Sequence, residues 1–146
     1  MKILLMLLLL FPVQSIEYGK PSELKGLKRV FIDVGLDLKN RGRIVEELEK
    51  SKLDFDVLES SEGAEIILQF KSDKDKRIAN VRTNRGNSRP TYESINTGAG
   101  TVFIAKGEKL RAVMSFEDEE MAFERKPATN FARTFLKAYK KANDLK

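Results

Sequence analysis

Carboxylates are the side chains of this 146-residue sequence that are best suited to catalysis or metal binding, because histidine and cysteine are both absent. Without these two residues the sequence offers no imidazole base, no thiol nucleophile and no soft ligand for a transition metal. Asp33 and Asp37 follow an apolar segment, and such a pair can bind a divalent cation or exchange protons with a substrate. Four more carboxylates form the run 117–120, Glu-Asp-Glu-Glu. One hypothesis is therefore a small carboxylate-based hydrolase or metal-dependent enzyme that uses Asp33, Asp37 and the 117–120 cluster.

These carboxylates also have a structural interpretation. An aspartate that closes a strand before a glycine turn, as Asp33 does, is common turn chemistry. The 117–120 run lacks the spaced oxygens and the glycine of a calcium loop, so it is better explained as a solvated acidic edge. The segment 97–101, Thr-Gly-Ala-Gly-Thr, lacks the lysine of a phosphate-binding loop and is expected to be a turn. We therefore favour a non-catalytic protein with no catalytic residue, no metal site and no cofactor.

The strongest indication of recognition is a basic segment, residues 71–89, in which seven lysines and arginines stand against two aspartates. Asparagine, glycine and proline accompany the charges between 84 and 90, and this composition is typical of a solvent-exposed loop. The segment is either a solvated surface or a site that attracts an anionic partner. The candidate ligand-binding residues are Lys74, Lys76, Arg77, Arg82, Arg85 and Arg89.

The first fifteen residues have the layout of a secretory signal peptide. Lys2 precedes nine consecutive apolar residues, and Val13 and Ser15 suit a cleavage site before Ile16. A helix of nine residues, at about 1.5 Å per residue, is too short to cross a hydrocarbon core of about 30 Å. Residues 1–15 are therefore predicted to be a signal peptide. The mature protein is expected in the periplasm or outside the cell, with no transmembrane segment.

The remaining residues have the composition of one packed domain. The sequence is 41% hydrophobic and 34% charged, which suits a single core. The lack of cysteine means that no disulfide stabilises the fold and that no cysteine carries a lipid anchor. Nucleic acid is not expected as a partner of an exported protein, although the net charge is +5. The expected partner is an anionic envelope component or another envelope protein.

The spacing of apolar residues after position 15 predicts a β-sheet with two helices. Residues 16–27 are expected to be a leader segment into a single domain at 28–146, with one helix from an Asn40 cap to Lys50 and another that begins at Pro127. The element order predicts an α+β domain, with a mixed β-sheet of about five to six strands and two helices packed on one face. The predicted strands cover residues 28–34, 53–57, 65–70, 78–83, 101–105 and 110–116, and the inward-facing residues of the last are Leu110, Ala112, Met114 and Phe116.

The segment from Leu110 onward, LRAVMSFEDEEMAFERKPATNFARTFLKAYKKAN, is similar to the C-terminal part of small exported bacterial proteins of unknown function. Its most specific portion is ERKPATNFA at 124–132, and VFIDVG at 30–35 and GAEIILQF at 63–70 resemble the same group more loosely. The resemblance implies a bacterial, exported, single-domain protein, and it assigns no catalytic residue. A fold-level likeness is to the amino-terminal α/β domains of envelope assembly factors. The favoured function is a non-catalytic, envelope-associated binding module, with the carboxylate enzyme as the alternative.

Overall fold

The computed structural model describes the backbone of residues 16–82, 88–120 and 126–146, and the side chains of these residues other than 74–95 and 120. The predicted signal peptide at 1–15 lies outside this range. The described elements are β1 (Glu17–Tyr18), the 3₁₀ helix η2 (Pro21–Leu24), β2 (Arg29–Asp33), α1 (Leu38–Lys50), β3 (Asp56–Leu58), β4 (Ile66–Arg82), β5 (Ser88–Lys106), β6 (Lys109–Glu120) and α2 (Pro127–Ala142).

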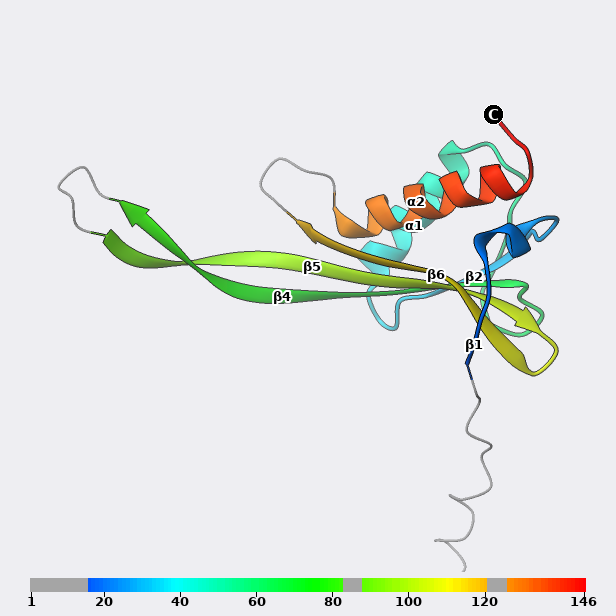
Figure 1. Ribbon diagram of the computed structural model, residues 1–146, viewed down its shortest axis with the longest axis horizontal. Helices are drawn as coiled ribbons and strands as arrows, with labels where there is room; N and C mark the ends of the chain where they lie inside the picture. Colours follow the sequence, from blue (N-terminus) through cyan, green and yellow to red (C-terminus); the bar gives the residue numbers. More distant parts are fainter. Residues whose placement is uncertain (1–15, 83–87, 121–125) are drawn as a thin grey trace, which may run out of the picture.

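The strands form one mixed sheet in the order β1-β6-β5-β4-β2-β3, and α1 and α2 lie on one of its faces (Figure 1). The central pairs, β4 with β5 and β5 with β6, are antiparallel. The outer pairs are parallel, and α1 is the crossover that joins β2 to the neighbouring β3. The prediction of an α+β fold with five to six strands and two helices on one face is confirmed.

The core lies between the two helices and the sheet face that they cover. Alternate residues of the central strands point into it, and the apolar stripe of α2 packs against them through Phe131, Phe135 and Tyr139. The Tyr139 hydroxyl donates a hydrogen bond to the Leu27 carbonyl at 2.7 Å, so the one polar atom of this buried ring is satisfied. The strand residues of the core are Val30, Ile32, Ile66, Leu68, Phe70, Val102, Ile104 and Val113.

The start of α1 differs from the prediction. Asp37, rather than Asn40, is the N-cap, and its Oδ1 accepts a hydrogen bond from the Asn40 backbone N–H at 3.2 Å. A carboxylate suits this position because the N-terminal end of a helix carries partial positive charge. Asn40 is instead a buried residue of the first turn, 6% exposed, and its side chain binds to neighbouring elements.

A β-bulge changes the face to which β6 residues point. Phe103 pairs with Ala112, but the preceding Val102 pairs with Met114, so Val113 is the extra residue of the bulge. Val113 is therefore in the core, and Met114 and Phe116 pack against it. The prediction that Leu110 and Ala112 share the inward face with Met114 and Phe116 is wrong. Strict alternation across the whole strand cannot hold, because the bulge shifts the register by one residue.

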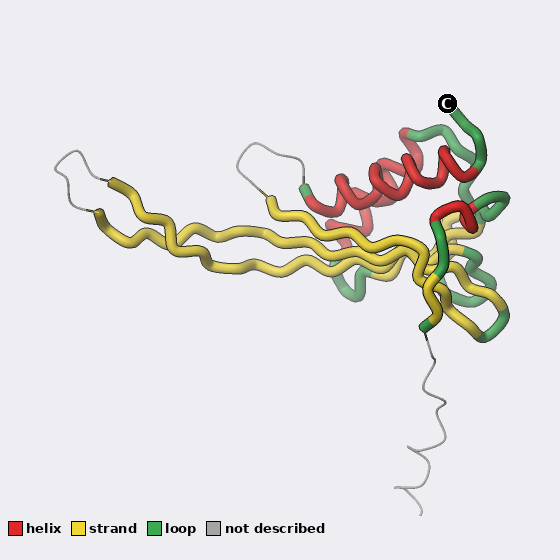
Figure 2. The backbone as a smooth tube through the Cα atoms, viewed as in Figure 1, coloured by secondary structure: helices red, strands yellow, loops and turns green. Residues whose placement is uncertain are grey.

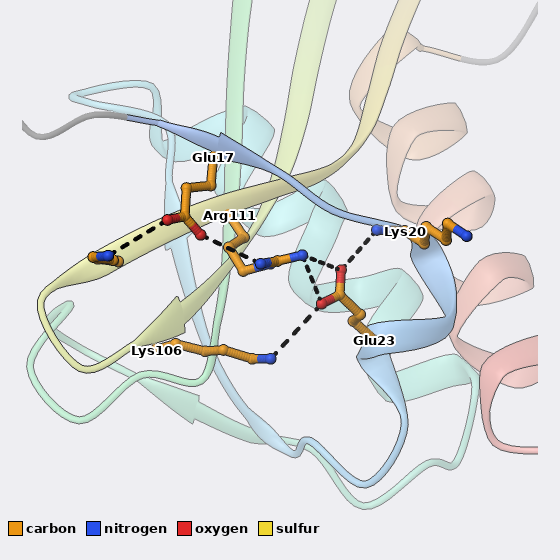
Figure 3. Close-up of polar contacts among 6 residues, drawn as sticks. Glu17, Lys20, Glu23, Lys106 and Arg111 are labelled. Atoms are coloured by element: carbon orange, nitrogen blue, oxygen red, sulfur yellow. Dashed lines mark hydrogen bonds and ion pairs between the residues drawn. The ribbon is translucent and has the colours of Figure 1, made fainter.

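The expected leader segment, residues 16–27, contributes to both sheet and core. Leu24 of η2 is fully buried, and β1 pairs with β6 at Arg111 and Ala112. Figure 3 shows Arg111 between two carboxylates, with its guanidinium 3.3 Å from Glu17 and 3.0 Å from Glu23. The backbone N–H of Lys20 donates to Glu23 at 2.7 Å, and this bond, with the Arg111 charge, holds the pKa of Glu23 below its usual value.

The largest departure from the prediction is at residues 71–99. Loop was predicted here apart from one strand at 78–83, but β4 continues without a break to Arg82 and β5 begins at Ser88. The pairing of β4 with β2 ends at Gln69, and that of β5 with β6 ends at Asn96. Beyond these points β4 and β5 pair with each other alone. The two-stranded ribbon of residues 75–82 and 88–95, here called the arm, projects from the domain (Figure 2).

Candidate binding site

The predicted ligand-binding residues are distributed along the arm and at its base. Lys74 pairs with Asn96, which lies at the base of the arm and is the β5 residue nearest the arm that also pairs with β6. Arg85 lies outside the described residues. The remaining four are at register positions of the arm: Lys76, Arg77, Arg82 and Arg89.

The arm extends well past the part of the sheet that the helices cover. Eight residues of β4, 75–82, span about 26 Å at about 3.3 Å per residue. The arm contains four basic residues (Lys76, Arg77, Arg82 and Arg89) and two carboxylates (Asp75 and Glu93), for a net charge of +2. A two-stranded ribbon alone is marginally stable in water, and charges on its strands discourage pairing with other edges. The arm is therefore a positively charged projection beyond the part of the sheet that the helices cover.

A cavity of about 240 Å³ lies where the arm leaves the domain. Its lining comes from the N-terminal ends of α1 and α2 and from the adjoining parts of β4 and β5. Phe70, Pro127 and Ala128 form an apolar part of the wall. The basic side chains that line the cavity are Lys39, Arg43 and Lys126.

One carboxylate, Asp37, also lines this cavity, and neighbouring donors already engage it. Its Oδ2 accepts hydrogen bonds from the Asn40 amide at 2.6 Å and from the Ser72 hydroxyl at 3.3 Å. The Asn40 amide also donates to Ser72 at 2.9 Å, which ties α1 to β4. The side-chain Oδ1 of Asn40 accepts a hydrogen bond from the Arg43 guanidinium at 2.9 Å and so holds this guanidinium at the wall of the cavity. The charges at the cavity are three cations and one anion.

Sequence reasoning missed this network, although the spacing of its helical members contained a clue. Asp37, Asn40 and Arg43 follow each other at intervals of three, which places them on one face of the first turns of α1. Ser72 and Lys126 come from distant parts of the sequence, and only the fold brings them to the same cavity.

The structure does not bring Asp33 and Asp37 to a common site. Asp33 binds the Gly35 N–H at 3.4 Å and the Gln69 amide at 3.5 Å, whereas Asp37 binds residues of α1 and Ser72. Asp33 therefore acts as the turn residue that its sequence context indicated, and Asp37 as the cap of α1.

The acidic run 117–120 lies at the end of β6, paired with β5 residues 96–99. Asp118 accepts a hydrogen bond from the Asn130 amide at 2.7 Å, which joins β6 to α2. Glu117 and Glu119 are exposed and line an open hollow of about 560 Å³ together with Lys71 and Asp73. Among the residues that the structure describes, no group of three or more acidic side chains is arranged to hold a metal ion.

The fold and these surfaces define the protein as an α+β domain with a charged two-stranded arm. No protein-family model and no curated protein matches the chain. Among solved structures, the chain is similar to a PDZ domain protein from Parabacteroides distasonis ATCC 8503, with 13% identity over 79% of this chain and a TM-score of 0.42. The match spans 32% of the length of that protein's chain.

The chain is also similar to uncharacterized lipoprotein B from Nitrosomonas europaea, with 20% identity and a TM-score of 0.46. This match covers 89% of this chain and 83% of the other. None of the helices in the described ranges has the length and apolar character needed to cross a membrane.

Proposed function

We propose that the protein is a non-catalytic, exported binding module whose basic arm holds an anionic component of the cell envelope. The observation that carries this proposal is the arm itself. It projects about 26 Å beyond the packed domain, as estimated from the rise of a strand, and it carries four of the six candidate cations. A long ribbon that extends beyond the helices and carries net positive charge is best explained as a contact surface.

The acidic run 117–120 is too distant to neutralise the outer part of the arm. Glu120 pairs with Asn96 at the base of the arm. Arg89 lies seven residues from Asn96 on β5, toward the tip, and this separation is about 23 Å at about 3.3 Å per residue. Exposed charges are largely screened beyond about 8 Å at physiological ionic strength. The acidic run therefore does not neutralise Arg82 and Arg89 at the outer end of the arm.

The export part of the proposal rests on the layout of residues 1–15. We expect the exported protein to begin at Ile16, because Ser15 and Val13 suit the cleavage site that follows the apolar run. The intact mass of protein recovered from the periplasm or medium measures this directly. Protein that still begins at Met1 would contradict the predicted cleavage.

The arm is tested by replacing Arg77, Arg82, Arg85 and Arg89 together with serine. Binding to vesicles that contain phosphatidylglycerol is expected to fall by roughly a thousandfold, because each basic residue near an anionic surface contributes about 1 kcal/mol. Wild-type binding should also weaken steeply with salt. The melting temperature should change little, since Arg77, Arg82 and Arg89 lie on the arm, beyond the part of β4 that pairs with β2. Vesicle sedimentation across a salt series, with a thermal melt, gives both measurements.

The matched control removes four positive charges from the opposite end of the molecule, where Lys137, Lys140, Lys141 and Lys146 lie on and after α2 (Figure 1). Replacing these four lysines with serine makes the same change in net charge but is expected to leave most of the binding intact. An equal loss in both variants would show that only net charge matters. Early melting of the arm variant would show that the arginines stabilise the fold, and either result would overturn the proposal.

A further inference from the structure

The turn between β2 and α1 exposes two leucines at the end of the domain from which the arm projects. Leu36 is 99% exposed and Leu38 is 76% exposed. Asp37, which lies between them, and Lys39, which follows Leu38, both line the cavity at the base of the arm. The two leucines therefore flank, in the chain, residues that line the cationic cavity, and with these exposures they gain little from the core.

The cavity is suited to a small anionic group. Its volume of about 240 Å³ is below the range of drug-sized sites, which begins at about 300 Å³. Lys39, Arg43 and Lys126 supply positive charge, and the hydrogen bond from Arg43 to Asn40 holds one of these cations in a defined place. Donors in a fixed fork, such as a guanidinium, match the oxygens of a phosphate group.

The end of α2 adds to the positive potential. Pro127 and Ala128, the first two residues of α2, line the cavity. Pro127 has no N–H, but the N-terminal end of a helix carries the positive part of the helix dipole. This contribution has the same sign as that of the three side chains.

We propose that this end of the domain docks on an anionic phospholipid bilayer. Leu36 and Leu38 enter the boundary between headgroups and acyl chains, and the cavity takes the phosphate of a lipid headgroup. Exposed apolar side chains beside cations provide the two contributions, apolar burial and electrostatic attraction, that hold a protein at a membrane surface. A soluble anion would account for the cations but not for the leucines. This inference rests on the proposed function for the sign of the partner's charge, and it specifies the partner's chemistry and the point of contact.

The docking test compares two double variants with wild type on vesicles of phosphatidylcholine and phosphatidylglycerol. Leu36→Ser with Leu38→Ser removes the apolar contacts, and Lys39→Gln with Lys126→Gln removes two cations of the cavity. Each double variant is expected to weaken vesicle binding by about tenfold or more. The matched controls, expected to bind as wild type, are Ile16→Ser with Leu145→Ser, and Lys137→Gln with Lys141→Gln.

A second measurement uses inorganic phosphate alone, followed by NMR titration of the backbone amides. Phosphate should shift the amides around the cavity in wild type and in the leucine variant, and the shifts should be lost in the Lys39 and Lys126 variant. No shift in wild type would overturn the proposal. Phosphate binding combined with undiminished vesicle binding by the leucine variant would also overturn it, because the cavity would then be a site for a soluble anion.

The two proposals fail in different ways. If the four arginine substitutions in the arm abolish vesicle binding and the leucine variant binds as wild type, the arm function is supported and the docking inference is wrong. If both cavity variants lose binding and the arm variant keeps it, the docking inference is supported and the arm function is wrong.

Discussion

Replacing Phe135 with alanine is expected to lower the free energy of unfolding by about 3–5 kcal/mol, the usual cost of deleting a buried phenylalanine ring. Phe135 is 0% exposed in the centre of α2, and its ring centroid is 5.9 Å from those of both Phe55 and Tyr139. The loss is a large share of the 5–15 kcal/mol that stabilises a typical domain. Urea denaturation followed by circular dichroism measures the change.

The control for this substitution is Tyr18→Ala, which also deletes an aromatic ring. Tyr18 is 86% exposed on the short strand β1, so the expected change is about 0.5 kcal/mol or less. If Phe135→Ala were equally mild, α2 would not pack on the sheet in solution. The binding surfaces at its N-terminal end would then lose their scaffold.

Elements with a strong apolar pattern were predictable from the sequence. The α2 stripe at Phe131, Phe135 and Tyr139 repeats every four residues after a proline suited to the first turn, and the structure places it where the pattern indicated. Local periodicity works here because one face of the helix must be apolar. The same reasoning identified β2, whose alternate residues Val30 and Ile32 are buried.

Only one strand of the arm was predicted, at 78–83, and the β5 half of the arm was not predictable by the same means. A strand is recognised by the alternation that burial of one face imposes, and residues 75–82 and 88–95 lie beyond the helices that create such a face. Their charged side chains, together with Asn80 and Pro90, therefore resemble loop composition. Pro90 is compatible with the ribbon because it lies on a strand with no second neighbour, where a missing N–H need not disrupt a ladder.

The candidate site was predictable in its chemistry but not in its geometry. Composition identified the cations of the 71–89 segment because like charges cluster there in the sequence itself. The cavity at the base of the arm combines Lys39 and Arg43 of α1 with Ser72 of β4 and Lys126 before α2, and no local pattern links these residues. Leu36 and Leu38 lie next to an expected strand end, and their exposure is evident only once the turn is placed.

The segment 97–101 shows how a correct observation led to a wrong element. Its two glycines indicated a turn, but both lie within β5, where they allow the close approach of α2. A Cβ at Gly98 would be 2.5 Å from the Pro127 side chain, and one at Gly100 would be 2.5 Å from the Phe131 ring. Glycine in a strand can mark such a contact as well as a turn.

Gly100→Ala is therefore expected to destabilise the protein by about 1–3 kcal/mol or more, the range for overpacking a core. The added methyl group would overlap the Phe131 ring, which cannot move aside easily because it is fully buried. The Phe131 ring packs against the rings of Phe70 and Phe116, with centroid distances of 5.5 Å and 5.6 Å. Chemical denaturation of the single variant measures this cost. Combination with Phe131→Leu should make the two changes less costly than their sum, because a smaller side chain relieves the overlap.

The same substitution at Gly42 should have the opposite sign. Gly42 lies within α1, and a Cβ there would meet nothing within 4 Å. Gly42→Ala is therefore expected to stabilise the protein by about 0.5–1 kcal/mol, the difference in helix propensity between the two residues. A stabilising or neutral Gly100→Ala would show that α2 does not approach β5 this closely. The cavity that both elements line would then have a different shape, and the phosphate site inferred there would lose its structural basis.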